Sequence, residues 1–258
     1  MARVSSVKYG ETVWSNLYAG NQHTVRCLKP AVLATESALE LGPQQRKRVV
    51  WRMDGGAGSD ENLRWLLARG YQIMAKGLSN RRAEAWANQV TRWDAYQDVF
   101  LAEILPPLDL GRPVRIFIKK RLKADKFCYS YYVSTLKLPA KGCFMSLYDR
   151  RGGAEVEQFR NDKLGLHLAS RRKNRFLAQK ALILLTDLVH NLIADFHHKV
   201  LIGTKFEPFA HKRIVRDLLQ IPGYLFFEND HLKRIELLKS HPNSKPLLIC
   251  LEKYISDD

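Results

Sequence analysis

The stretch Arg48-Val-Val-Trp-Arg-Met-Asp-Gly-Gly-Ala-Gly-Ser-Asp-Glu-Asn-Leu-Arg-Trp-Leu-Leu-Ala-Arg-Gly-Tyr71 decides the fold class of this chain. It opens with a β-prone run at residues 48–53, and after a glycine-rich turn its spacing predicts a helix over residues 61–69. A second strand is predicted at residues 71–76, followed by a helix that runs to residue 90. The order strand, helix, strand, helix is typical of an α/β layer in which the strands pair in parallel.

Small polar residues and glycines mark the ends of these predicted elements. Either Ser59 or Asp60 caps the first helix, and Gly70 closes it. Ser79 caps the second helix. These signals support the helix boundaries independently of the apolar pattern.

The segments on either side are assigned in the same way. Residues 5–17 are predicted to be extended, and residues 24–41 form a helix that stops at Gly42-Pro43. From residue 92 to about 145 the chain is β-rich, with a hairpin around Lys123-Ala-Asp-Lys126. The remaining predicted elements are a helix that begins after Gly152-Gly153, a helix at 176–198, strands at 224–227 and 232–238, and a helix at 245–254.

Basic residues outnumber acidic residues by a wide margin. The 258 residues include 42 Lys and Arg against 26 Asp and Glu, which gives a formal net charge of +16 and a pI near 9.8. With 46% hydrophobic and 26% charged residues, the composition is that of a folded protein and not of a disordered basic tail. The charge therefore predicts an anionic partner, nucleic acid first and a membrane surface second.

Composition also argues against several classes of protein. The longest apolar stretch, residues 181–196, contains two Asp, one His and one Asn, so we expect it to be too polar and too short to span a bilayer. The first eight residues lack the continuous apolar run of a signal peptide. The cysteines include no CxxC pair, which predicts buried thiols in a reducing cytoplasm. They are Cys27, Cys128, Cys143 and Cys250.

Asp54 is the first candidate for chemistry. It ends the first predicted strand and precedes glycines, which is where open α/β sheets bind ligands. Glycines let the backbone approach a phosphate or a metal-bound oxygen closely. The alternative is an Asp that only caps a tight turn between strand and helix. A dinucleotide site is disfavoured, because the third glycine of that fingerprint is absent.

A second acidic segment lies at residues 148–163 and places Glu155 or Glu157 on a helix among basic residues. An acid at a strand end and another on a later helix suit a divalent-metal site for phosphoryl transfer, because Mg²⁺ prefers carboxylate oxygens. Neighbouring Arg and Lys side chains can bind the phosphate. The alternative is a surface helix of mixed charge.

Together the two segments resemble the DDE transposases of bacterial insertion sequences. Residues 52–71 resemble the region of that family in which a strand ends in the second catalytic Asp, a glycine-rich turn follows, and the next helix ends at a glycine. Tyr148, Arg151 and Glu155 match the family's signature of Tyr, two residues, Arg, three residues and Glu. The resemblance extends over roughly residues 9–251.

The resemblance implies a set of site residues and a cofactor. Asp54 would be the second metal-binding acid and Glu155 the third, with Glu157 as the alternative, and the ion would be Mg²⁺ or Mn²⁺. Tyr148 and Arg151 would help to hold the phosphates of the transposon ends. Further DNA contacts are expected from Lys163, Arg171, Arg172 and Lys173.

The fold that the resemblance implies is an α/β, RNase H-like mixed sheet with flanking helices, interrupted by a β-rich insertion. The expected domains are residues 1–91 for the N-terminal part of the catalytic domain, 92–145 for the insertion, 146–200 for the C-terminal part, and 201–258 for a small α/β extension.

The chain departs from the family's pattern in two places. Seven residues separate Glu155 from Lys163, where the signature has six, and an eight-residue step turns a helix by about 80°. No Asp precedes Asp54, although the family's first catalytic Asp lies on an upstream strand. We therefore expect an N-terminally truncated transposase with impaired activity.

The expected function is DNA cleavage and strand transfer by two-metal phosphoryl transfer. The alternative is a non-catalytic DNA-binding remnant or regulator of transposition, since basic runs such as residues 171–175 can neutralise phosphates without chemistry. The expected partners are transposon-end and target DNA. No membrane partner is expected, and a homodimer remains open. The expected location is the bacterial cytoplasm, in association with the nucleoid.

Overall fold

The computed structural model of the chain describes residues 1–168, 170–171 and 173–256, without the side chains of residues 151–158. The chain divides into two compact units. Unit 1 consists of Met1–Val4 and Tyr18–Gly153, and unit 2 consists of Ser5–Leu17 and Ala154–Asp258. Neither unit is a single continuous segment. The domain boundaries expected at residues 91, 145 and 200 stay a prediction.

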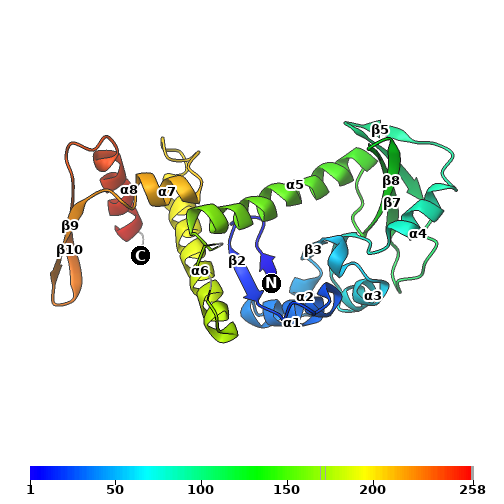
Figure 1. The fold of residues 1–258 in the computed structure, drawn as a ribbon, viewed down its shortest axis with the longest axis horizontal. Coiled ribbons are helices and arrows are strands. Elements are labelled where there is room, and N and C mark those ends of the chain that lie inside the picture. Colours follow the sequence, from blue (N-terminus) through cyan, green and yellow to red (C-terminus); the bar gives the residue numbers. More distant parts are fainter. Residues whose placement is uncertain (169, 172, 257–258) are drawn as a thin grey trace. The chain divides into compact units, whose positions relative to one another are not determined.

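Unit 1 is built on a six-stranded mixed sheet with the strand order β3-β4-β8-β7-β6-β5 (Figure 1). Its strands are β3 (Val50–Met53), β4 (Gln72–Lys76), β5 (Asp94–Tyr96), β6 (Val99–Ile104), β7 (Arg115–Lys123) and β8 (Lys126–Ser134). The first two strands pair in parallel, with Val50 opposite Gln72, as the sequence predicts. All the other neighbouring strands pair antiparallel. The predicted α/β class is confirmed.

The predicted hairpin is formed by β7 and β8. Its two turn residues, Ala124 and Asp125, have φ angles of 46° and 59°, as a two-residue turn matched to the strand twist requires. The strands from residue 94 onward extend the same sheet that β3 and β4 begin. In this chain the β-rich segment therefore supplies most of the sheet of unit 1.

The helices of unit 1 begin where the sequence signals place them. They are η1 (Thr24–Cys27), α1 (Leu28–Ala38), α2 (Pro43–Arg46), η2 (Gly55–Ala57), α3 (Asp60–Ala68) and α4 (Asn80–Ala87). The Ser59 hydroxyl accepts from the Asn62 N–H at 3.3 Å, so Ser59 and not Asp60 caps α3. The Ser79 hydroxyl accepts from the Arg82 N–H at 3.1 Å and caps α4.

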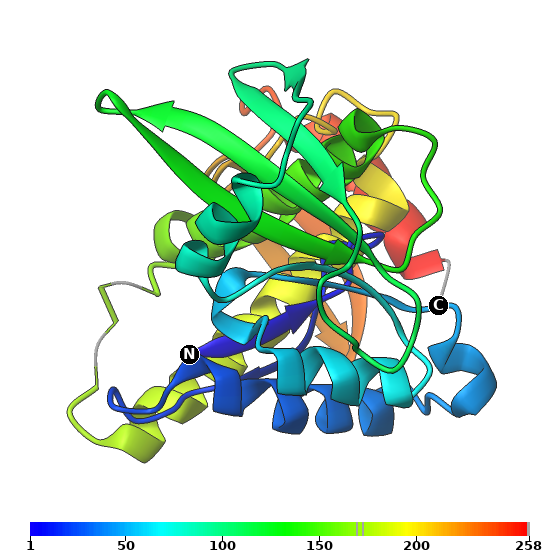
Figure 2. The same ribbon diagram turned by 90° about the vertical axis from the view of Figure 1, so that its right-hand side faces the viewer.

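Both faces of the sheet are covered. On one face, the side chains of β3, β4 and β8 pack on α1 and α3, which lie side by side in blue and cyan in Figure 2. On the other face, Met74, Phe117 and Tyr132 pack against Phe144 and Tyr148 of α5 (Lys141–Arg160). The strands therefore alternate between two apolar layers.

Helix α5 corrects one sequence prediction. We expected a helix to begin after Gly152-Gly153, whereas α5 begins at Lys141 and continues through both glycines. Each helical glycine costs about 1 kcal/mol relative to alanine. Burial of Phe144 and Met145 against the sheet offsets this cost, because each is at most 1% exposed.

Unit 2 is mostly helical. Its elements are β2 (Thr12–Asn16), a π-helical turn η3 (Asn161–Gly165), α6 (Phe176–Phe196), a second π-helical turn η4 (His197–Leu201), α7 (His211–Asp217), β9 (Gly223–Glu228), β10 (His231–Leu237) and α8 (Ser244–Ser256). A further strand, β1 (Ala2–Ser5), precedes β2 in the chain. The predicted long helix, the two later strands and the last helix are confirmed.

The hairpin of β9 and β10 projects from the part of unit 2 that holds α7 and α8 (Figure 1). Asn229 and Asp230 turn the chain with φ angles of 50° and 61°. Every residue of β9 is exposed, including Tyr224 and Phe227. This hairpin consequently contributes little to the core of unit 2.

Helix α6 is the most apolar element of the chain. With the turn that follows it, residues 176–201 form a stretch that is long and apolar enough to cross a membrane by length and composition, with a mean hydropathy of 1.3. By length and composition this contradicts the expectation that the stretch is too short and too polar to span a bilayer, because the helical segment extends beyond residues 181–196 at both ends. A core helix of a soluble protein can have the same composition, but such a helix is mostly buried, whereas only 28% of the most apolar part of this one is buried. The polar residues that interrupt it bind other parts of unit 2, as described below.

The four cysteines are free thiols, but only two are buried. Cys27 and Cys250 lie in the cores of the two units, whereas Cys128 and Cys143 are exposed. The prediction of four buried thiols is therefore wrong for two of them. Cys128 lies near the tip of the β7–β8 hairpin, beyond the part of the sheet that α5 covers.

Candidate functional site

The carboxyl ends of β3 and β4 form the candidate site of unit 1. Asp54 follows β3 directly and is exposed, and its side chain accepts a hydrogen bond from the N–H of Gly55. Its carboxylate forms no ion pair with any described residue. The capping function considered for Asp54 is thus present, and the residue remains exposed.

The glycine-rich turn lies directly against the segment that follows β4. A Cβ atom at Gly58 would lie 2.0 Å from the carbonyl oxygen of Lys76, and one at Gly77 would lie 1.9 Å from the ring of Tyr131. The Leu78 N–H donates to the Gly58 carbonyl at 3.2 Å. Glycine at position 58 is required here because two backbone segments touch, and no ligand is needed to explain it.

Tyr148 of α5 is fixed at the same strand end as Asp54. It is 4% exposed, and its hydroxyl donates to the carbonyl oxygen of Met53 at 3.1 Å. One residue earlier on the strand, the Arg52 guanidinium donates to the carbonyl oxygen of Leu147 at 3.0 Å. The structure therefore brings together Asp54 and Tyr148, two predicted site residues from distant parts of the sequence.

Two charged residues beside the turn are already engaged with each other. Arg82 donates to both carboxylate oxygens of Asp60, at 2.7 and 2.9 Å, and to the hydroxyl of Tyr131 at 3.3 Å. The Asp60 carboxylate raises the pKa of Arg82, and burial raises the pKa of Tyr131. This network positions α3 against α4 and leaves Asp54 as the exposed acid at the strand end.

A hollow of about 530 Å³ adjoins the glycine turn. Residues from η1, from the start of α3 and from the loop after β4 line it. They are Asn21, His23, Val25, Arg26, Ser59, Glu61 and Leu78. The hollow is wide and open, so it gives a ligand access to this side of the turn without enclosing it.

Several predicted site residues fall outside the described side chains. Arg151, Glu155 and Glu157 belong to α5, but only their backbone is described, and Arg172 lies outside the described residues altogether. Of the predicted DNA contacts, Lys163 in η3, Arg171 and Lys173 are exposed residues of unit 2. None of those three forms an ion pair within the described part of the chain.

Two further lysines, Lys76 and Lys119, lie on the α5 face of the sheet. In the pairing of β4 with β8, Lys76 is opposite Tyr132. On β7, Phe117 is opposite the same tyrosine, and Lys119 lies two residues after Phe117. Two methylenes of Lys76 lie along Gly55, 3.5 and 3.7 Å from where a Cβ would be. Finding them required the register of three strands that are distant in sequence.

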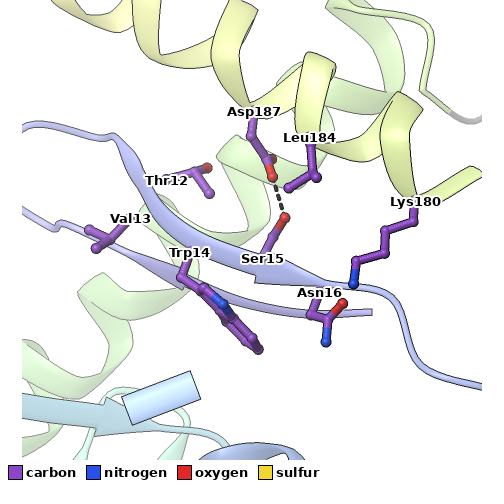
Figure 3. Close-up of a pocket in the computed structure, with 8 residues that line it drawn as sticks. All are labelled: Thr12, Val13, Trp14, Ser15, Asn16, Lys180, Leu184 and Asp187. Atoms are coloured by element: carbon purple, nitrogen blue, oxygen red, sulfur yellow. Dashed lines mark hydrogen bonds between the residues drawn. The ribbon is translucent and has the colours of Figure 1, made fainter. Parts of the chain in front are cut away.

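Unit 2 has a pocket of its own, of about 360 Å³, between β2 and α6 (Figure 3). Figure 3 shows the hydroxyl of Ser15 donating to the carboxylate of Asp187 at its centre, with Lys180 and Asn16 at one end. The lining residues are Thr12, Val13, Trp14, Ser15, Asn16, Lys180, Leu184 and Asp187. Because Ser15 and Asp187 bond to each other, they hold β2 on α6.

A buried histidine cluster lies elsewhere in unit 2. Both His190 and Asp162 are fully buried, and the His190 ring nitrogens lie 2.8 Å from the Asp162 carboxylate and 2.9 Å from the Gly10 carbonyl. The His211 ring stacks on His190 at 4.4 Å. Burial, and then the neighbouring His190, lower the pKa of His211 to about 4. The contacts are internal and join four segments of unit 2.

Asp54 supplies a suitable donor for a hard divalent cation. Its carboxylate is the ligand type that Mg²⁺ prefers, and its exposure leaves room for the waters that this ion keeps. Among the side chains that the structure describes, no three His, Cys, Asp or Glu residues gather at one place. Glu155 and Glu157 are not among those side chains. No family model and no curated protein matches the chain.

Proposed function

We propose that this protein is derived from a DDE transposase of a bacterial insertion sequence and acts on DNA in the cytoplasm. In this proposal the sheet of unit 1 belongs to an RNase H-like fold, and residues 92–145 correspond to its β-rich insertion. The net charge of +16 supports an anionic partner such as DNA.

The meeting of Asp54 and Tyr148 carries this proposal. The resemblance selects both residues from motifs about 90 positions apart, without reference to any structure. The hydroxyl of Tyr148 bonds to the carbonyl of Met53, the residue immediately before Asp54. A chance surface helix of mixed charge gives no reason for that contact. The contact therefore favours the resemblance over the alternative that the two motifs are unrelated.

The chemistry proposed for the site is phosphoryl transfer. Asp54 would hold a Mg²⁺ or Mn²⁺ ion as the second metal-binding acid, and the resemblance assigns Glu155, or alternatively Glu157, as the third. When bound, such an ion activates the attacking oxygen and stabilises the leaving oxygen of a phosphodiester. Tyr148 positions the end of β3 and therefore the carboxylate of Asp54. Residues 1–53 contain no Asp, so they offer no counterpart to the family's first catalytic Asp.

The second candidate is a non-catalytic DNA-binding protein or regulator of transposition. Lys163, Arg171 and Lys173 favour it, because they are exposed, form no ion pair with any described residue, and can contact phosphates without a metal. Both candidate functions require DNA binding, but only the catalytic one requires Asp54 to bind a metal ion.

Fluorescence anisotropy with a labelled DNA duplex tests the DNA binding that both candidates require. We expect the dissociation constant to rise more than about tenfold between 50 and 200 mM salt, because each phosphate contact releases a counterion. Absence of DNA binding at 50 mM salt would contradict both candidates. The same measurement with Mn²⁺ present establishes whether the ion strengthens binding.

Mn²⁺ binding measured by electron paramagnetic resonance separates the two candidates. Asp54→Asn keeps the side-chain shape and should lower Mn²⁺ affinity at least about tenfold, since it removes a charged oxygen ligand. The control is Glu84→Gln, which removes one charge from an exposed acid of α4. Equal Mn²⁺ binding by wild type and Asp54→Asn would favour the regulator. Plasmid nicking with Mn²⁺ that Asp54→Ala abolishes would favour the catalytic candidate.

A further inference from the structure

Lys119 is a partly buried lysine on the α5 face of the sheet. Its ammonium lies 5.4 Å from the centre of the Tyr132 ring, which in turn packs edge-on against Tyr148 at 4.8 Å. Lys119 forms no ion pair in the part of the chain that the structure describes. Other basic residues of the same sheet do form them: Arg115 bonds to Glu103, and Arg121 to Asp98.

The surroundings make the charge on Lys119 costly. Burial lowers the pKa of Lys119, and the nearby positive charges of Lys76 and Arg121 lower it further. The Asp149 carboxylate acts in the opposite direction but does not form an ion pair with it. A half-buried ammonium without a counter-ion is stabilised when an anion binds beside it.

Lys76 extends the same face toward Asp54. Its side chain runs along Gly55, the residue after Asp54, and it too lacks an ion-pair partner among the residues described. Contacts within unit 1 connect Lys119 to the end of β3. Lys119 lies over the ring of Tyr132, which is opposite Lys76 in the sheet. Tyr132 packs on Tyr148, and Tyr148 bonds to the carbonyl of Met53. Two lysines that form no ion pair with any described side chain therefore lie on the face that ends at the exposed carboxylate of Asp54.

We propose that Lys119 and Lys76 form a phosphate-binding site for the DNA backbone beside Asp54. The site rests on the proposed function, since DNA is the source of the phosphodiester. The lysines neutralise a phosphate, and Asp54 lies at the edge of the same sheet. Lysine suits this purpose as a compact point charge that does not require the bidentate geometry of arginine.

The test compares neighbouring lysines on one strand. Lys119→Gln removes the proposed contact, whereas Lys120→Gln removes an identical charge on the opposite face, where the Lys120 ammonium lies 4.5 Å from the Phe127 ring centre. Anisotropy titrations with a labelled duplex are carried out between 50 and 200 mM salt for each variant. Lys119→Arg, which keeps the charge, controls for a change in folding.

We expect Lys119→Gln to weaken binding about three- to tenfold at 100 mM salt and to lower the salt slope by about one. Lys76→Gln should act in the same direction, and Lys119→Arg should restore the slope. Lys120→Gln should change affinity less than about twofold. Inorganic phosphate at millimolar concentration should compete less effectively with the DNA in Lys119→Gln than in wild type.

Equal losses of DNA affinity in Lys119→Gln and Lys120→Gln would contradict the proposed phosphate-binding site, because the lower overall charge would then explain both losses. That result leaves the proposed function standing, since the wild-type protein would still bind DNA. If wild type does not bind DNA at all, the site and the proposed function both fail.

Discussion

The hydrogen atom that serves as the side chain of Gly58 controls how closely the turn after β3 approaches β4. A methyl group there would lie 2.0 Å from the Lys76 carbonyl oxygen, a backbone atom that no rotamer change can move. The φ angle of Gly58 is −83°, so the constraint is steric contact and not a left-handed backbone. This glycine fixes the turn that holds Asp54.

Gly58→Ala should therefore destabilise unit 1 by roughly 1–3 kcal/mol, the usual cost of overpacking. Urea denaturation followed by circular dichroism measures this loss. Gly20→Ala is the matched control, because a Cβ at Gly20 meets nothing within 4 Å. If the two variants are equally stable, the close approach of the two loops is not a constraint on the fold.

His211 makes the stability of unit 2 dependent on pH. Its pKa is lowered to about 4 by burial and by the adjacent His190, whereas an unfolded histidine titrates near 6.5. Between these values the unfolded state binds more protons than the folded state. Stability from this residue is thus fully present above pH 6.5 and is lost as the pH falls toward 4.

We expect the free energy of unfolding of unit 2 to fall by up to about 1.4 kcal/mol per pH unit in that window. Protection factors of α6 amides, measured by hydrogen exchange, report the change. His211→Gln should flatten the dependence, while His231→Gln, at an exposed histidine of β10, should leave it intact. A slope that survives in His211→Gln would assign the effect to other groups.

At the scale of elements, α6 shows how polar residues in an apolar helix can be structural. Asn191 accepts from the Thr12 N–H at 2.8 Å and donates to the Thr12 carbonyl at 2.8 Å. Asp187 accepts from the hydroxyl of Ser15, one turn earlier on the same face. These bonds satisfy the backbone of β2, which explains the interruptions in the apolar run.

Asn191→Leu preserves the size of this side chain and removes both bonds to Thr12. Leaving a buried N–H and a buried carbonyl unpaired should cost roughly 2–4 kcal/mol. We expect faster proteolysis and faster hydrogen exchange in residues 5–17. Leu192→Ala, at a side chain that is 56% exposed, should change neither rate appreciably. Unchanged protection of β2 in Asn191→Leu would mean that other contacts hold the strand.

The elements were predictable to the extent that local signals specify them. Ser59, Ser79 and Gly70 act through their immediate neighbours, so the helix boundaries they mark could be predicted from the sequence. Helix α5 could not be placed, because its glycines favour a break and only the apolar face of a sheet formed elsewhere in the chain overrides them. Non-local packing therefore determines where α5 begins and that it continues through its glycines.

At the scale of the whole molecule, the parallel pairing of β3 and β4 was predictable from the order of elements. The pairing of β4 with β8 was not, because it joins strands about 60 residues apart. The candidate site likewise contains residues that the sequence could predict and residues that it could not. Asp54 and Tyr148 were selected from motifs, whereas Lys76 and Lys119 share a face only because of the sheet register.

The division of the chain into units has a consequence for the order of folding. Residues 18–153 are continuous and can fold as they emerge from the ribosome, but the bonds of β2 to α6 join residues that are 172 and 179 positions apart. At common rates of synthesis, β2 waits on the order of ten to thirty seconds for α6 to be made. An early strand with a late partner makes unit 2 the slower to assemble and the part most exposed to mispairing on the ribosome.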